Sequence, residues 1–142
     1  MFQNTQTMKD KELHSAYQET NFRVLLSKEK YLDINIDKYQ PELEINLKGL
    51  KSWAFITAHN PDSELYDIAI NKVRNLQLEE DLKNLNLKYL QAVGISKDEK
   101  WKEESFFIIN CSLSQALKLS KKYGQLAFVF GEVRDKAQLI YP

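Results

Sequence analysis

The most regular hydrophobic pattern in the first third of the chain lies in residues 31–37, where leucine and isoleucine alternate with polar side chains. A period of two predicts a strand with one buried face. Residues 22–26 (FRVLL) predict a second strand, and the four polar residues between the two runs predict a hairpin. We expect a short helix over residues 10–20 and another from Pro41, because proline suits the first turn of a helix.

Two later runs, 52–58 (SWAFITA) and 105–111 (SFFIINC), are hydrophobic almost without interruption. Such runs are typical of strands that are covered on both faces in the middle of a sheet. Helical patterns and further strands surround them: helices over about 62–85 and 112–123, and strands over 88–93, 126–130 and 137–141. A capping box, Ser112 with Gln115, marks the start of the second helix.

This order of elements predicts an α+β fold with a mixed sheet and a split βαβ (ferredoxin-like) core from residue 52, preceded by a helix and a β-hairpin. The two long helices are expected on one face of the sheet, and residues 9–50 on the other. In the predicted core, strands 52–58 and 105–111 are central, adjacent and parallel. The segments that follow them, 59–63 (HNPDS) and 111–115 (CSLSQ), then lie at one edge of the sheet, where ligands favour binding.

Composition points to one ordinary globular domain, residues 1–142, with residues 1–8 as a flexible arm. Twenty Lys and Arg balance 20 Asp and Glu, which argues against a nucleic-acid partner. No apolar run is long enough for a membrane span or a signal peptide, so we expect no membrane partner and a cytoplasmic location. The single cysteine, Cys111, fits a reducing compartment.

The expected sheet edge brings Cys111 near His59 and Asn60, which raises the hypothesis of a Cys/His nucleophile. A cysteine that ends an apolar strand is more often a small buried hydrophobe, so this alternative is not favoured. One cysteine and two histidines make no recognisable zinc cluster, and a calcium-like acidic series has Lys38 where the loop needs glycine. We therefore expect no metal and no cofactor.

Residues within 62–85 form two stripes at helical spacing. The apolar stripe, expected to face the core, consists of Tyr66, Ala69, Ile70 and Val73. The flanking polar stripe of Asp67, Asn71 and Arg74 is either a solvated face or part of a binding site. Arg74 is the candidate anion anchor, because guanidinium suits planar anions.

Residues 54–61 (AFITAHNP) resemble the AFITA-x-NP signature of a bacterial family of small single-domain proteins, the domain of unknown function 3293 family. Similarity extends from about residue 16 to residue 141. It includes Asn71 and Arg74, a W-x-E-x-S pattern (Trp101, Glu103, Ser105) and Tyr-Gly-Gln at 123–125. The family commonly has tryptophan at the position of His59, which argues against catalysis by His59 and favours Asn60. The resemblance implies no activity, substrate or cofactor.

Two functions remain open. A non-catalytic regulatory or protein-interaction module, with an unspecified protein partner, is favoured because no nucleophile, base and orienting group occur together. The alternative is a small-molecule site, binding or enzymatic, for a polar or anionic ligand at the end of the two central strands. Its candidate ligand-binding residues are Thr57, Asn60, Asn71, Arg74, Glu103, Ser105 and Gln125. Their convergence on one pocket would favour the ligand hypothesis.

Overall fold

The structure is a computed structural model that describes residues 11–60 and 65–142. Its elements, after a helix over residues 11–18, are β1 (Thr20–Leu25), β2 (Tyr31–Ile34), α2 (Pro41–Asn46), β3 (Ser52–Ile56), α3 (Ile68–Asn84), β4 (Lys88–Ser96), β5 (Lys102–Ile109), α4 (Leu113–Lys122), β6 (Phe128–Glu132) and β7 (Gln138–Ile140). Within these described residues, no helix combines the length and the apolar character needed to cross a bilayer.

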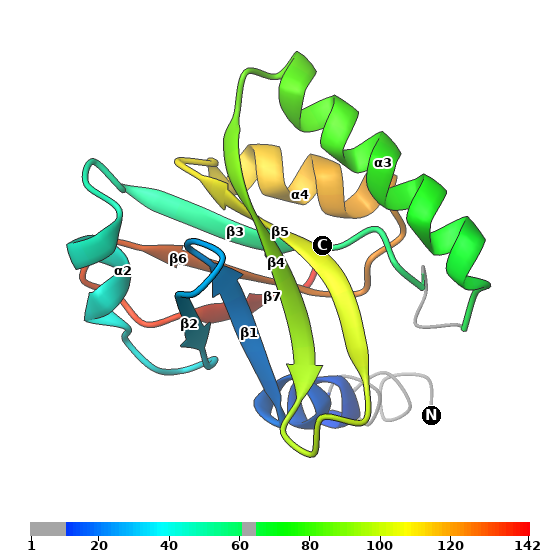
Figure 1. Cartoon of the computed structure of the whole chain (residues 1–142), viewed down its shortest axis with the longest axis horizontal. Helices are drawn as coiled ribbons and strands as arrows, with labels where there is room; N and C mark the ends of the chain where they lie inside the picture. The colour runs from blue at the N-terminus through cyan, green and yellow to red at the C-terminus, as the bar shows by residue number, and fades with distance from the viewer. Residues whose placement is uncertain (1–10, 61–64) are drawn as a thin grey trace, which may run out of the picture.

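The strands form one curled sheet of seven in the order β2-β1-β4-β5-β3-β6-β7 (Figure 1). Every pair of neighbours is antiparallel. The α+β class predicted from sequence is therefore confirmed, whereas the predicted mixed sheet is wrong. The hairpin β1–β2 joins this sheet beside β4 rather than lying on its face as a separate layer.

The two hydrophobic strands β3 and β5 are adjacent, but they run in opposite directions, with Phe55 opposite Phe107. The tight connection at 97–101 makes β5 antiparallel to β4, and the α3 crossover has already made β4 parallel to β3. The prediction of parallel central strands is thus wrong. The segments that follow β3 and β5 lie at opposite ends of the sheet, and the end of β3 meets the beginning of β5 instead.

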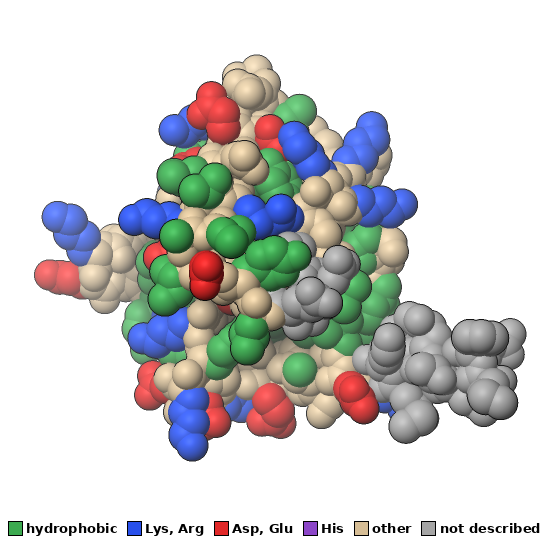
Figure 2. Space-filling view, turned by 90° about the vertical axis from the view of Figure 1, so that its right-hand side faces the viewer, with side chains coloured by type: hydrophobic (Ala, Val, Ile, Leu, Met, Phe, Trp, Pro, Cys, Tyr) green, Lys and Arg blue, Asp and Glu red, His purple; other side chains and the backbone are tan. Residues whose placement is uncertain are grey.

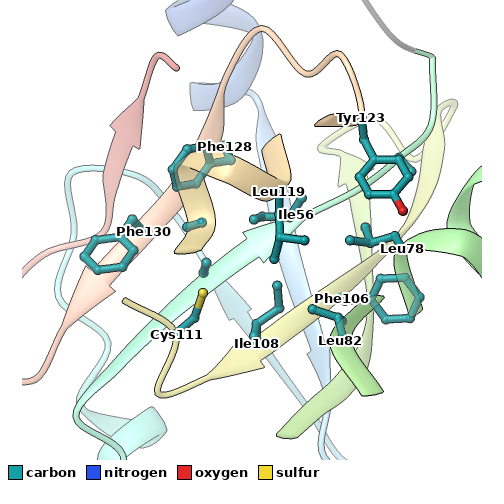
Figure 3. Close-up of a cluster of buried hydrophobic side chains, with 13 residues drawn as sticks. Ile56, Leu78, Leu82, Phe106, Ile108, Cys111, Leu119, Tyr123, Phe128 and Phe130 are labelled. Atoms are coloured by element: carbon teal, nitrogen blue, oxygen red, sulfur yellow. The ribbon is translucent and has the colours of Figure 1, made fainter. Parts of the chain in front are cut away.

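Helices α3 and α4 cover one face of the sheet (Figures 1 and 3). Alternate residues of β3, Ala54 and Ile56, point to this face and pack against Leu78 and Leu82 of α3 and Leu119 of α4. These five side chains are at most 5% exposed. Burial of each larger side chain contributes about 1.5–3 kcal/mol, so this layer fixes both helices on the sheet.

The opposite face of the sheet curls around a second core. Phe22 and Ile34 of the β1–β2 hairpin meet Phe55 and Phe107 of the central strands, and α2 adds Leu43. Phe22 and Phe55 pack edge to face, with ring centroids 5.1 Å apart. The curl lets the hairpin bury its apolar side while it remains part of the sheet.

The capping box predicted at the start of the second long helix is confirmed. The capping box is complete, with Ser112 accepting from the Gln115 backbone amide and Gln115 accepting from that of Ser112. Gly124 follows α4 with a φ of 67°, the left-handed conformation that favours glycine. β4, by contrast, continues through Gly94 to Ser96, three residues beyond the predicted end at residue 93.

The first half of α3 is turned the opposite way from the prediction. Ile70 and Val73 of the predicted apolar stripe are 45% and 55% exposed, whereas Asn71 and Asn75 are 6% and 5% exposed. The helix begins after Asp67, whereas the predicted start near residue 62 lies outside the described residues. The side chains of Asn71 and Asn75 point inward and form hydrogen bonds with backbone groups at the end of the sheet.

Candidate functional site

The end of β3 and the beginning of β5 are joined by side chains where the ladder of backbone bonds stops, after the pair Ile56 and Phe106. The Thr57 hydroxyl donates to the Glu104 carbonyl over 2.7 Å. Asn75 of α3 donates to the same carbonyl over 2.8 Å and accepts from the Ala58 amide over 2.8 Å. Asn75 therefore supplies the partners that a further strand residue would have supplied, which explains why it faces inward.

Asn60 is held by a reciprocal pair of hydrogen bonds with Asn71. The Asn60 amide N–H donates to Asn71 Oδ1 over 2.9 Å, and Asn71 Nδ2 donates to Asn60 Oδ1 over 2.8 Å. Asn60 Oδ1 also accepts from the Tyr66 amide over 3.0 Å. Asn60 has a φ of 46°, a left-handed conformation that asparagine tolerates better than most residues.

Arg74 and Gln125 tie the same segment to the end of α4. Arg74 donates from Nε to the Ala58 carbonyl over 3.0 Å and from Nη2 to the Tyr123 carbonyl over 2.8 Å. Gln125 Nε2 donates to the His59 carbonyl over 2.9 Å. We call Asn60, Asn71, Arg74, Asn75 and Gln125 the bracing network, because their side chains fix the backbone between β3 and α3.

A cleft of about 1090 Å³ opens on the sheet face away from α3 and α4, between helix 11–18, the end of β3 and the start of β6. Its polar side chains include Thr20, Thr57, His59, Asn60, Ser96, Glu103, Ser105 and Gln125. Its apolar side chains include Leu13, Tyr17, Phe22, Phe55, Leu65, Trp101 and Leu126. The Tyr17 hydroxyl donates to the Ala127 carbonyl over 2.9 Å, which anchors helix 11–18 at the cleft wall.

Glu103 places a carboxyl group in this cleft. Burial raises the pKa of Glu103 to about 7, although a hydrogen bond from Asn60 Nδ2 at 3.4 Å acts in the opposite direction. Burial also lowers the pKa of His59, and a smaller opposing effect comes from Glu104. A carboxyl group that titrates near neutral pH in a cleft is a candidate functional group.

The predicted site residues divide into two groups. Thr57, Asn60, Glu103, Ser105 and Gln125 line the cleft. Asn71 and Arg74 lie behind it, and their polar groups bond to the chain itself.

Several cleft residues were missed by the sequence analysis, including Tyr17, Phe22, Phe55 and Gly94. The strand period of Phe22 and Phe55 signals only burial. Tyr17 lies in the helix expected over residues 10–20, where no motif indicated a binding or catalytic role. Trp101 was noticed only through its spacing from Glu103 and Ser105 in the W-x-E-x-S pattern.

Cys111 lies far from the cleft, so the Cys/His nucleophile hypothesis is wrong. Its carbonyl accepts from the Ser52 hydroxyl over 2.7 Å, beside the first residue of β3, at the opposite end of the strand from His59. The thiol is fully buried, and burial raises the pKa of Cys111 to about 11. In the described ranges, no three His, Cys, Asp or Glu side chains are grouped as they would be to hold a metal ion.

Searches of curated proteins and of solved structures found no match. A family model described as "Protein of unknown function (DUF3293)" matches residues 56–128. The matched segment runs from the last residue of β3 to the first residue of β6, and it contains the whole bracing network together with Glu103. Because the match covers more than half of the sequence, this chain belongs to the DUF3293 family.

Proposed function

We propose that this chain binds a small organic molecule in the cleft beside Glu103. The observation that carries the proposal is the cleft itself, with a volume of about 1090 Å³ and with polar and apolar walls. Binding sites for small molecules are concave, mostly apolar and equipped with a few polar groups that orient the ligand, commonly within about 300–1,000 Å³.

The cleft lining supports a molecule with an apolar body and hydrogen-bond donors. Phe22, Phe55 and Leu126 offer apolar surface, while Glu103 and Ser105 offer oxygen acceptors. No Lys or Arg occurs among the described residues that line the cleft. We therefore do not retain the anionic ligand expected from sequence, since Arg74 lies behind the cleft and donates from Nε and Nη2 to two backbone carbonyls.

The bracing network supports a binding site that is formed before the ligand arrives. Asn71 accepts from the N–H and Gln125 donates to the carbonyl of the peptide group between His59 and Asn60, so the cleft wall needs little rearrangement. Preorganised walls avoid much of the entropic cost of ordering a site on binding. We propose binding rather than catalysis because Cys111, the nucleophile candidate from sequence, is remote from the cleft.

Filling the cleft from Gly94 tests this proposal. A Cβ built on Gly94 meets nothing closer than 3.8 Å, so Gly94→Leu should fold while its side chain occupies cleft volume. A thermal-shift screen of small organic compounds on the wild-type chain should yield stabilising hits. At one hundred times the dissociation constant, a hit stabilises by about 2.7 kcal/mol.

Gly94→Ala is the matched control, because it changes the same backbone position and adds little volume. Gly94→Leu should abolish the stabilisation and Gly94→Ala should preserve most of it. A screen without hits, or hits that stabilise Gly94→Leu as strongly as wild type, would overturn the proposal.

The exposed apolar side of α3 favours a second candidate function, the interaction module. Ile68, Val73 and Leu76 are 87%, 55% and 57% exposed. Figure 2 views the molecule from the right-hand side of Figure 1. It shows hydrophobic side chains gathered near the centre of this face, with Lys and Arg around them. Lys72 and Glu80 lie one helical turn on either side of Leu76, so two antiparallel copies of α3 can pair them across a twofold axis.

We propose a second copy of this chain as the partner of that surface. Sedimentation velocity should then detect a dimer that Leu76→Lys dissociates, whereas Gln77→Lys, an adjacent exposed substitution, should leave more of it intact. A wild-type chain that stays monomeric at high micromolar concentration would refute this second proposal.

We also propose that the split βαβ (ferredoxin-like) core predicted from sequence is present in an all-antiparallel form. The order β4-β5-β3-β6 and the position of α3 and α4 on one face support it. An experimental structure in which another strand separates β3 from β5 would refute it.

A further inference from the structure

Resting on the proposed function, we infer that the cleft takes an organic cation, an amine with an apolar body, whose ammonium group pairs with Glu103. This inference names the class of ligand and makes binding depend on the protonation of one side chain.

The charged groups around Glu103 favour a cation. Glu12 of helix 11–18 and Glu19, in the turn that follows it, belong to the cleft lining, and no Lys or Arg lines the cleft in the parts of the chain that the structure describes. His59, the basic side chain in the lining, has a lowered pKa because of burial, so it is neutral at pH 7. A negative potential without a nearby cation attracts positively charged ligands and repels anions.

Two tyrosines, Tyr17 and Tyr141, are further titratable groups that line the cleft with Glu103. Burial raises the pKa of Tyr17, and the negative charge of Glu103 and the nearby Tyr141 raise it further. Tyr17 therefore stays neutral across the physiological range and does not compete with Glu103 for protons.

The Glu103 carboxylate has bonding capacity for a ligand. Oε2 accepts one long hydrogen bond from Asn60 Nδ2, at 3.4 Å, and Oε1 accepts none from the described residues. An ammonium group carries three donors and no acceptor, so it can donate to carboxylate oxygens that accept few hydrogen bonds from the protein. Charge-assisted bonds of this kind are about twice as strong as bonds between neutral groups.

Aromatic rings of the cleft suit the rest of such a ligand. Phe22 and Phe55 lie in the lining, and Trp101, which lines the same cleft as Glu103, is 44% exposed. Indole is the best of the aromatic faces for attracting an ammonium group, and the phenyl rings offer apolar contact. An amine joined to an aromatic or aliphatic body can use both features at once.

Binding of a cation is coupled to proton release. With a pKa of about 7, Glu103 is roughly half protonated at pH 7. An ammonium group beside the carboxyl favours its ionised form, so binding expels the remaining proton to solvent. Affinity should therefore rise with pH, by roughly 100-fold between pH 5 and pH 8, because the ionised fraction of Glu103 rises by that factor.

Three probes of similar shape test the inference: 2-phenylethylamine, 2-phenylethanol and phenylacetate. Their affinities for the full chain can be measured by isothermal titration calorimetry at pH 5, 7 and 8, in buffers of different ionisation enthalpy that reveal proton release. We expect the amine to bind more tightly than the alcohol at pH 8, with phenylacetate weakest, and only the amine to show a steep pH dependence.

Glu103→Gln keeps the shape of the side chain and removes its charge. It should lower the affinity for the amine at pH 8 at least tenfold, abolish its pH dependence and leave the alcohol nearly unchanged. Glu29→Gln, an exposed substitution between β1 and β2 with the same change in net charge, should alter none of these values.

The outcomes separate the two proposals. Equal binding of all three probes, or a pH-independent affinity for the amine, overturns the inference and leaves the cleft as a binding site. If no probe binds at millimolar concentration and Gly94→Leu changes no hit of the compound screen, both proposals are overturned.

Discussion

Replacement of Arg74 tests whether this residue braces the site or binds a ligand. Arg74→Met keeps most of the aliphatic stem but removes the donors to the carbonyls of Ala58 and Tyr123, at 3.0 and 2.8 Å. Hydrogen bonds from a charged donor contribute about 1.5–3 kcal/mol each. Because Arg74 is only partly buried, the lower end applies to both bonds, and we expect a loss of about 3 kcal/mol in the free energy of unfolding.

Urea denaturation, followed by circular dichroism and tryptophan fluorescence, measures this loss at constant m value. Arg74→Lys keeps the charge but cannot reach both carbonyls with one planar group, so about half of the loss should remain. Lys118→Met, an exposed substitution on α4, should stay within about 0.5 kcal/mol of wild type.

Two results would contradict the assignment of a bracing role to Arg74. The first is an Arg74→Met chain that unfolds within about 0.5 kcal/mol of wild type. The second is a specific stabilisation of the wild-type chain by phosphate that Arg74→Met loses, which would restore the anion-anchor hypothesis.

Three further predictions concern packing, pH and backbone strain. Gly131→Ala should destabilise the fold by about 2–3 kcal/mol in urea titrations, because its Cβ would lie 2.4 Å from the ring of buried Trp53; Gly94→Ala, with 3.8 Å of clearance, should be neutral or slightly stabilising. Wild-type stability should fall by roughly 2–3 kcal/mol as the pH rises from about 4.5 to about 7, because the raised pKa of Glu103 means that the folded chain holds a proton the unfolded chain releases. Glu103→Gln should lack that slope when urea midpoints are compared at pH 5 and pH 8. Asn60→Ala should be less stable than Asn60→Gly by about 1 kcal/mol, since both lose the side-chain bonds but only alanine opposes a φ of 46°.

Each of these predictions has a result that would refute it. Equal stability of Gly131→Ala and Gly94→Ala would mean that Trp53 yields to the added methyl group. A wild-type chain whose stability is flat between pH 5 and pH 8 would place the pKa of Glu103 near its ordinary value. An Asn60→Gly chain no more stable than Asn60→Ala would show that the left-handed backbone relaxes in both.

Much of the secondary structure could be inferred from local patterns. The alternation in residues 31–37 predicts a hairpin strand, and β2 occupies its first part. Ser112 and Gln115 mark the start of α4, and Gly124 marks its end. These features depend on neighbours within a few residues, so a local pattern is sufficient to specify them.

The candidate site could be inferred only in part. Thr57 and Asn60 were identified from their position after β3, and Glu103 and Ser105 from a resemblance, and the cleft brings these four together. The sequence prediction placed the site where two parallel central strands end. That placement was wrong, because β3 and β5 are antiparallel. Glu103 is near Asn60 because β5 begins, rather than ends, beside the end of β3.

The chain's own patterns thus specify where strands and helices form, and that β3 and β5 lie at the centre of the sheet. Strand direction depends instead on how the elements connect, and the short turn between β4 and β5 reverses the chain. The face that α3 buries is likewise set at long range: unpaired backbone groups of Ala58 and Glu104 require polar partners, so Asn75 turns inward and Val73 faces solvent. A buried backbone group without a hydrogen bond costs more than an exposed valine, and that balance exists only once the sheet has formed.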